Sequence, residues 1–242
     1  MFDGLKKKGF QVLALHHGEA ILKHDMSTAV QELEAVLGDI AIPIEELVYG
    51  GGGEGELTQR LRRALSETYG WNKHVFEIKK TVDGVEKESI SHEIDHVKKF
   101  TNGTFALEIE WNNKDPFYDR DLENFKRLHA NGVISIGGII TRGESLQKGM
   151  ESLFVTFAKK SGVNSLDKLN RFYTPTPRQK QIITKSAKSR GSFEEGWAHT
   201  FVSDKFGEAT THWRKLEDRV RRGVGNPCPL LLVGIPIGVV SV

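Results

Sequence analysis

Apolar positions in the first part of the chain follow the spacing of helices. Leu33 and Leu37 lie on the inward face of a helix predicted over residues 28–38, which ends at a glycine. Leucines at every fourth position predict a second helix over residues 57–68, directly after a run rich in glycine. Neither segment contains a residue pattern that points to chemistry, so both are expected to pack against a core.

The pattern changes from helical to alternating at about residue 75. Alternating residues 75–82 meet Asp83-Gly84, a strong signal for a two-residue hairpin turn, and the returning strand begins at Val85. A second return is expected at Asn102-Gly103. The two turns predict an antiparallel meander of three strands.

The second half of the chain alternates helices with buried strands. Asp115-Pro116 opens a helix, and residues 133–140 are almost continuously apolar, as in a strand that is buried on both faces of a sheet. A helix over 146–160, a turn-rich stretch over 161–213, a helix over 212–222 and a strand over 230–235 complete the chain. We therefore expect one α/β domain over residues 1–242, with a core at about 50–160 and loops, a helix and a strand at about 161–242.

Composition indicates a soluble protein in a reducing compartment. The 242 residues carry a formal net charge of only +2, and the single cysteine, Cys228, excludes an intramolecular disulfide and is expected to be a small buried apolar residue. We expect a cytoplasmic protein, because the N-terminus lacks the apolar run of a signal peptide and the C-terminal apolar run is too short to span a bilayer. Basic residues gather between positions 159 and 222, which favours a phosphate-rich partner.

The glycine run over residues 50–55 satisfies the pattern GxGxxG through Gly50, Gly52 and Gly55. A dinucleotide site also requires a βαβ unit and an acidic residue after its second strand, and neither is legible here. The run is either a flexible entry to the following helix or a close backbone approach that brings Glu54 or Glu56 near a metal.

Residues 91–111 offer two mutually exclusive chemistries. As a helix, His92-Glu93-Ile94-Asp95-His96 matches the HExxH pattern of zinc peptidases, in which Glu93 polarises the metal-bound water. Two β-branched residues and the Asp-Gly hairpin upstream favour an extended chain instead. The zinc peptidase is kept as an alternative, together with a DNA-binding protein that has no catalytic activity.

As a hairpin, the same stretch gathers carboxylates. A turn at Asn102-Gly103 pairs Val97 with Glu108 and Asp95 with Glu110, so that Asp95, Glu108 and Glu110 project from one face of the sheet. Clustered carboxylates repel one another unless a cation lies between them. The arrangement therefore predicts either a site for a hard divalent metal or carboxylates with raised pKa values.

Asp95 followed by Glu108-Ile109-Glu110 resembles the core motif of PD-(D/E)xK nucleases, in particular type II restriction endonucleases of the BglII/BstYI kind. The similar stretch covers about fifty residues, from Glu93 to Thr141-Arg142-Gly143. The resemblance implies a PD-(D/E)xK core, in which a central mixed β-sheet with an antiparallel catalytic meander is flanked by helices. It also implies Mg²⁺-dependent, sequence-specific cleavage of double-stranded DNA that leaves 5′-phosphate ends.

The resemblance further assigns roles and partners. Asp95, Glu108 and the carbonyl of Ile109 are expected to bind Mg²⁺, and Glu110 is expected to orient or deprotonate the attacking water or to help hold a second metal. Glu56, or Glu54 near it, is expected to complete the site. Glu110 occupies the position of the usual motif lysine, as in BamHI-like enzymes. Family members act as homodimers, and a cognate DNA methyltransferase is implied.

DNA contacts are expected from the turn-rich half of the chain. Cationic side chains placed in loops can reach phosphates and guanine edges, and hydroxyl or imidazole groups at a helix start can form hydrogen bonds with bases. The candidates are Arg178, Lys180, Lys188, Arg190, Thr211 and His212.

Overall fold

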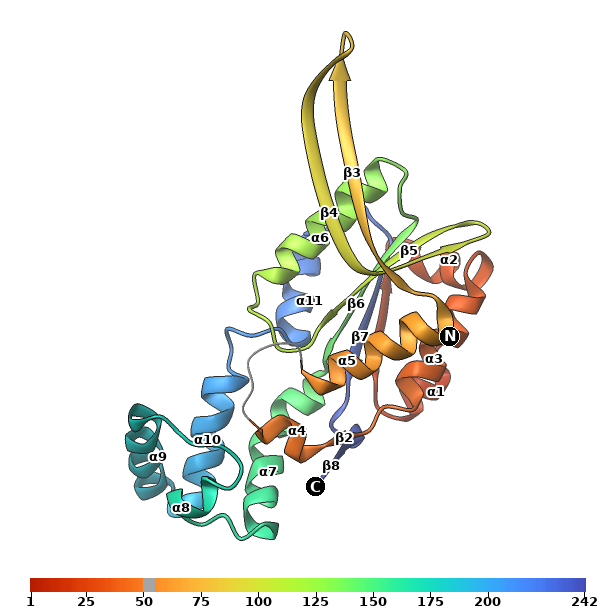
Figure 1. Ribbon diagram of the computed structural model, residues 1–242. Helices are drawn as coiled ribbons and strands as arrows, with labels where there is room; N and C mark the ends of the chain where they lie inside the picture. Colours follow the sequence, from red (N-terminus) through yellow and green to blue (C-terminus); the bar gives the residue numbers. More distant parts are fainter. Residues whose placement is uncertain (50–54) are drawn as a thin grey trace.

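The computed structural model describes residues 1–49 and 55–242, and a six-stranded mixed sheet runs through its centre (Figure 1). Strands β5, β6 and β7 are parallel, and the remaining pairs are antiparallel. In spatial order the strands are β1 (Gln11–Leu15), β7 (Leu230–Ile235), β6 (Ile136–Arg142), β5 (Gly103–Glu110), β4 (Val85–Phe100) and β3 (Asn72–Val82). The expected α/β fold with a mixed central sheet is confirmed.

Strands β3 and β4 form a long hairpin that projects beyond the body of the molecule (Figure 1). Val82 pairs with Val85, so the two-residue turn at Asp83-Gly84 is confirmed. Both turn residues have positive φ angles, of 51° and 78°, as a turn of type I′ requires. Only the base of this hairpin packs against the rest of the chain, through Phe76 and Ile94.

The expected turn at Asn102-Gly103 is wrong by one residue. Phe100 pairs with Gly103, so the turn is Thr101-Asn102 and Gly103 is the first residue of β5. A Cβ on Gly103 would lie 2.1 Å from Oγ of Ser135, so this glycine permits a close approach of two segments rather than forming the turn itself.

One face of the sheet is covered by α6 (Phe117–Ala130) and α11 (Trp213–Arg221). Helix α6 was expected, and its apolar stripe packs onto Val97, Ala106 and Ile139 of the sheet. The helix lies very close to β6, because a Cβ on Gly137 would be 2.6 Å from the ring of Phe125. This contact fixes α6 against the strands that carry the acidic residues.

Helices from the first part of the chain and one helix from its middle cover the opposite face, where they pack on Phe105, Leu107 and Ile109. These helices are α1 (Asp3–Lys7), α2 (Gly18–His24), α3 (Ser27–Gly38), α5 (Glu56–Arg63) with its π-helical extension η1 (Ala64–Thr68), and α7 (Glu144–Lys160). The predicted helices over 28–38, 57–68 and 146–160 are thus confirmed to within a few residues.

Residues 161–213 were expected to be mainly turns, but they contain three helices. These are α8 (Leu166–Leu169), α9 (Pro177–Arg190) and α10 (Phe193–Lys205). Helices α9 and α10 form an antiparallel pair at one end of the molecule, where α10 contacts α7 (Figure 1). Thr176 and Gln179 form a capping box at the start of α9, with proline as its first residue.

Short elements complete the described chain. Strands β2 (Ile42–Pro43) and β8 (Val240–Ser241) pair in parallel, next to α4 (Ile44–Val48) and the 3₁₀ turn η2 (Ile237–Val239). Cys228 is a free, fully buried thiol, as expected. Within the described ranges, none of the helices combines the length and apolar character needed to cross a membrane.

Candidate active site

The acidic face predicted for β4 and β5 is present, although its register differs. Val97 pairs with Ala106, and His96 pairs with Leu107. Continued by one residue, this register places Asp95 opposite Glu108 rather than Glu110. The difference is two residues, and side chains two positions apart share a face, so the three carboxylates remain on one side of the sheet.

A β-bulge re-aims the chain at Asp95. Asn72 of β3 pairs with Val97 of β4, whereas His74 pairs with Ile94, so Lys73 alone faces two residues of β4. Those two residues are Asp95 and His96. Bulges of this kind are common beside active sites, because the extra residue redirects side chains.

The same bulge excludes the zinc-peptidase interpretation. The stretch is a strand, and the bulge turns His92 and His96 toward opposite faces of the sheet. His92 lies near Asn124 and Arg127 of α6, whereas the charge of Arg62 in α5 acts on His96. The two histidines therefore do not lie one helical turn apart, as the ligands of a zinc peptidase do. Burial lowers the pKa of His96 to about 4.

Helix α6 adds a carboxylate that the sequence analysis missed. Asp121 is 1% exposed and lies with the buried Glu108 and Glu110, while the side chain of Asp95 is 52% exposed at the rim. The position of Asp121 on the helix contained a signal, because Tyr118, Asp121, Leu122 and Phe125 share one face. An acidic residue inside an apolar stripe indicates a buried polar site.

Burial raises the pKa values of the three buried carboxylates. Burial, followed by the charge of Asp121, raises the pKa of Glu108 well above its ordinary value. The same two causes raise the pKa of Glu110 to about 8, and burial also raises the pKa of Asp121. Without a cation, the cluster therefore cannot ionise completely at neutral pH.

Two side chains partly compensate this cluster. Nε of Arg120 donates a hydrogen bond to Oδ1 of Asp121 at 2.8 Å, and the same guanidinium lies 3.5 Å from Oε1 of Glu110. Asn113 donates to Oε2 of Glu110 at 2.8 Å. Oδ2 of Asp121 is buried and has no partner in hydrogen-bonding geometry among the described residues.

The donor set has the chemistry that a hard divalent cation requires, because all of its groups are carboxylate oxygens and an orphaned acceptor lies among them. In the described ranges, no three His, Cys, Asp or Glu side chains already stand at metal-binding geometry. A cation would therefore draw the carboxylates together from the positions seen here. Attraction between the cation and the carboxylates would supply the driving force for this movement.

The N-terminus of α5 approaches the site without bringing Glu56 into it. A Cβ on Gly55 would lie 3.9 Å from the ring of Trp111, just after Glu110. Glu56 itself is exposed, and it is not among the main charges that act on Glu108 or Glu110. Glu54 and most of the glycine run, including Gly50 and Gly52, lie outside the described residues.

Thr211 and His212 were expected to contact DNA directly, and their burial corrects this expectation. They are 0% and 2% exposed. Oγ1 of Thr211 accepts a hydrogen bond from the backbone N–H of Asn113 at 3.0 Å, and the backbone N–H of Thr211 donates to the carbonyl of Asn113 at 2.9 Å. These residues fix the loop after β5 and are not available to bases.

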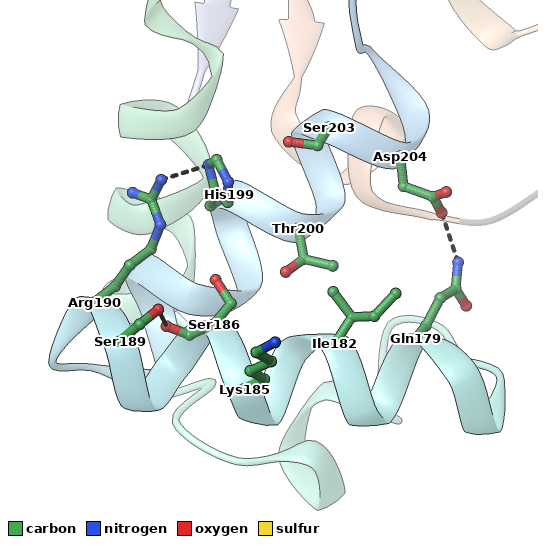
Figure 2. A pocket seen from close by; sticks show the side chains of 10 residues that line it. All are labelled: Gln179, Ile182, Lys185, Ser186, Ser189, Arg190, His199, Thr200, Ser203 and Asp204. Atoms are coloured by element: carbon green, nitrogen blue, oxygen red, sulfur yellow. Dashed lines mark hydrogen bonds between the residues drawn. The ribbon is translucent and has the colours of Figure 1, made fainter.

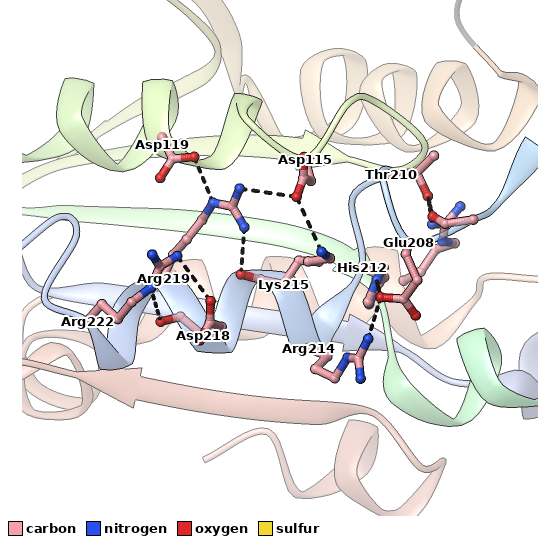
Figure 3. A network of polar contacts seen from close by, with 12 residues as sticks. Asp115, Asp119, Glu208, Thr210, His212, Arg214, Lys215, Asp218, Arg219 and Arg222 are labelled. Carbon is pink, nitrogen blue, oxygen red and sulfur yellow. Dashed lines mark hydrogen bonds and ion pairs between the residues drawn. The ribbon is translucent and has the colours of Figure 1, made fainter.

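Ionic and polar contacts extend from this loop to α11 (Figure 3). Arg219 of α11 contacts Asp115 and Asp119 at 3.3 and 2.8 Å, while Lys215 lies 3.6 Å from Asp115. The buried Arg142, at the end of β6, donates to Asn112 and Thr210. The network holds the start of α6, and therefore Asp121, beside the end of β5.

The cationic candidates of the second half lie on a helix rather than in loops. Arg178, Lys180, Lys188 and Arg190 all belong to α9. Arg190 is paired with Glu151 at 2.8 Å, so its charge is partly neutralised. A groove of about 580 Å³ lies between α9 and α10, and Figure 2 shows Lys185, Arg190 and other polar side chains along it.

A comparison with protein families agrees with this geometry. The family described as restriction endonuclease BglII/BglIII matches residues 10–235, which is nearly the entire chain. No curated protein matches the sequence. The match extends from β1 to β7 and so includes the whole six-stranded sheet with its acidic cluster. The chain therefore belongs to the BglII/BglIII family of type II restriction endonucleases.

Proposed function

We propose that this restriction endonuclease cleaves double-stranded DNA at a specific sequence by Mg²⁺-dependent hydrolysis. The observation that carries the proposal is the cluster of Glu108, Glu110 and Asp121, which is buried, acidic and only partly compensated. A buried cluster of this kind costs stability, and a divalent cation offsets that cost.

Asp95, Glu108 and the carbonyl of Ile109 would hold the cation, and Asp121 extends this set of oxygen donors. A bound divalent ion would supply two effects: polarisation of the scissile phosphate and a lowered pKa of a coordinated water. Asp95 is the exposed member of the set, so it is the carboxylate that an incoming phosphodiester meets first.

Glu110 is proposed to be the general base. Its pKa of about 8 keeps it protonated at neutral pH, so it accepts a proton only after positive charge enters the cluster. The water oxygen forms a bond to phosphorus while its proton passes to the Glu110 carboxylate. The bond from phosphorus to O3′ breaks, and O3′ takes a proton from solvent, which gives 5′-phosphate and 3′-hydroxyl ends.

We propose that DNA phosphates contact cationic side chains of α9, namely Arg178, Lys180 and Lys188. Arg190 is a weaker candidate because it is paired with Glu151. Homodimerisation would match a palindromic site, and a cognate methyltransferase would protect the host DNA.

The test is incubation of the purified protein with phage DNA in Mg²⁺ and, separately, in EDTA. Discrete fragments with 5′-phosphate ends in Mg²⁺ alone support the proposal, and the fragment ends give the recognition sequence. Asp95→Asn and Glu108→Gln should abolish cleavage, whereas Glu77→Gln, an exposed carboxylate on β3, should not. Smearing would indicate a non-specific nuclease, and tight binding without any nick would indicate a non-catalytic DNA-binding protein.

Two further measurements address the partners. Light scattering with and without a duplex that contains the mapped site determines whether the active species is a dimer. Resistance of that site to cleavage in genomic DNA from the source cell would reveal the methyltransferase.

A further inference from the structure

The strand that carries Glu108 and Glu110 has no cation of its own at the site. Glu110 occupies the position of the motif lysine, and the neighbouring Arg120 is committed to other contacts. Arg120 holds Asp121 through two nitrogens at 2.8 Å, and its guanidinium lies 4.4 Å from the ring centroid of Phe117. Its charge therefore compensates buried carboxylates.

Lys73 is a second cation at the rim of the site. It is the single β3 residue that faces the bulge at Asp95 and His96. Its Nζ lies 3.6 Å from Oδ1 of Asp95 and 2.7 Å from Oε1 of Glu93. The bulge thus brings one amine and the exposed carboxylate of the site together.

The contacts of Lys73 leave its amine accessible. The side chain is 56% exposed, and both of its partners are more than half exposed as well. Nζ of Lys73 donates a hydrogen bond to Oε1 of Glu93, and a lysine amine is charged at neutral pH. An exposed ammonium held beside Asp95 can bind a phosphate oxygen without first breaking a buried ion pair.

We propose that Lys73 is the catalytic cation of this enzyme: it contacts a non-bridging oxygen of the scissile phosphate and replaces the charge that Glu110 removes from the motif. This inference rests on the proposed nuclease function. The ammonium would stabilise the negative charge that develops on phosphorus oxygens as water attacks, while Glu93 and Asp95 hold it in place.

The experiment compares Lys73→Gln, Lys73→Arg and Lys79→Gln with the wild-type enzyme. Lys79 is the matched control, because it is also an exposed lysine of β3 with an acidic partner, Glu86, at 3.6 Å. Single-turnover cleavage of a duplex that contains the mapped site is measured in saturating Mg²⁺. Lys73→Gln should slow cleavage about 100-fold, as loss of one transition-state contact does, Lys73→Arg should remain within about tenfold, and Lys79→Gln should match wild type.

A second readout does not depend on cleavage. Duplex binding is measured in EDTA over a series of salt concentrations. Loss of one phosphate contact should reduce the slope of log K against log salt by about 0.9 for Lys73→Gln, with no change for Lys79→Gln. An unchanged slope together with cleavage within threefold of wild type overturns the inference, as does equal impairment of the Gln and Arg variants.

The two proposals fail differently. If wild-type protein never cleaves DNA, the nuclease proposal fails, and the slope measured on a random-sequence duplex still decides whether Lys73 contacts phosphate. If wild type cleaves and Lys73→Gln cleaves equally well, only the assignment of Lys73 fails.

Discussion

Replacing Glu110 with glutamine should change how the stability of the metal-free protein depends on pH. Burial and the charge of Asp121 raise the pKa of Glu110 from 4.5 to about 8 in the folded state. Glutamine keeps the shape and one hydrogen-bond donor of the protonated acid, but it cannot ionise. The variant therefore isolates the ionisation of this single group.

The sign and size follow from proton linkage. Below pH 4.5 the carboxyl is protonated in both states, and its contribution to stability is fully present. Between pH 4.5 and about 8 the unfolded chain releases a proton that the folded chain retains, so the free energy of unfolding falls by ~1.4 kcal/mol per pH unit. The free energy of unfolding can fall by at most about 5 kcal/mol by pH 8. Because Glu110 and Asp121 interact and titrate together, we expect a loss of about 2–5 kcal/mol.

The assay is urea unfolding in EDTA at pH 5, 6, 7 and 8, for wild type, Glu110→Gln and the exposed control Glu77→Gln. The stability of Glu110→Gln relative to wild type should increase steadily with pH, and the control should follow wild type. Mg²⁺ should restore much of the wild-type stability at pH 8 and have a smaller effect on Glu110→Gln. Parallel pH curves for wild type and Glu110→Gln would show that Glu110 has an ordinary pKa and that the cluster is not strained.

Three further changes test the packing, the loop and the DNA-binding face. Gly137→Ala places a methyl group against Phe125 and should cost about 1–3 kcal/mol in urea unfolding, whereas Gly4→Ala, whose added Cβ meets only an ordinary contact, should not destabilise. Thr211→Val should cost about 0.5–1.5 kcal/mol, because it removes the partly buried hydrogen bond to the N–H of Asn113, without changing the salt dependence of DNA binding. Arg178, Lys180 and Lys188 of α9 can be replaced together by glutamine. This change should reduce the slope of log K against log salt for duplex binding by up to about 2.7, and an unchanged slope would show that these side chains do not contact DNA.

Local patterns were sufficient for much of the fold. The hairpin at Asp83-Gly84, the buried strand β6 and the inward stripe of α6 each depend on residues close together in the sequence, and the structure has all three. The carboxylate face was also predictable, because an error of two residues in register does not change the face of a strand.

The bulge was harder to predict because no change in the residue composition of the strand marks its position. Its signal was a spacing of three between the apolar Ile94 and Val97, where an uninterrupted strand has a spacing of two. That single extra residue separates His92 from His96 and brings Lys73 to Asp95. The sequence thus matches HExxH, a pattern that binds zinc only on a helix, but the residues form a strand in which the two histidines cannot share a metal ion.

Helix α9 was missed for a different reason. Only Ile183 of α9 is buried, so the helix lacks the apolar stripe that marks most helices. The capping box of Thr176 and Gln179 was its remaining signal, and the surrounding Thr-Pro repeats obscured it. Asp121 was missed because its place in the apolar stripe of α6 indicates burial alone, whereas its contact with β5 depends on packing between distant segments.

The charges at the site favour the binding of a divalent cation. Five carboxylates lie at the site and its rim, at Glu93, Asp95, Glu108, Glu110 and Asp121, and two cations lie against them, Lys73 and Arg120. Full ionisation leaves an excess of three negative charges, so the site still carries a negative charge after one divalent cation has bound. The buried carboxylates that destabilise the free protein at neutral pH are thus the same groups that would make metal binding favourable, and we expect Glu110 to act as a base only when a cation is present.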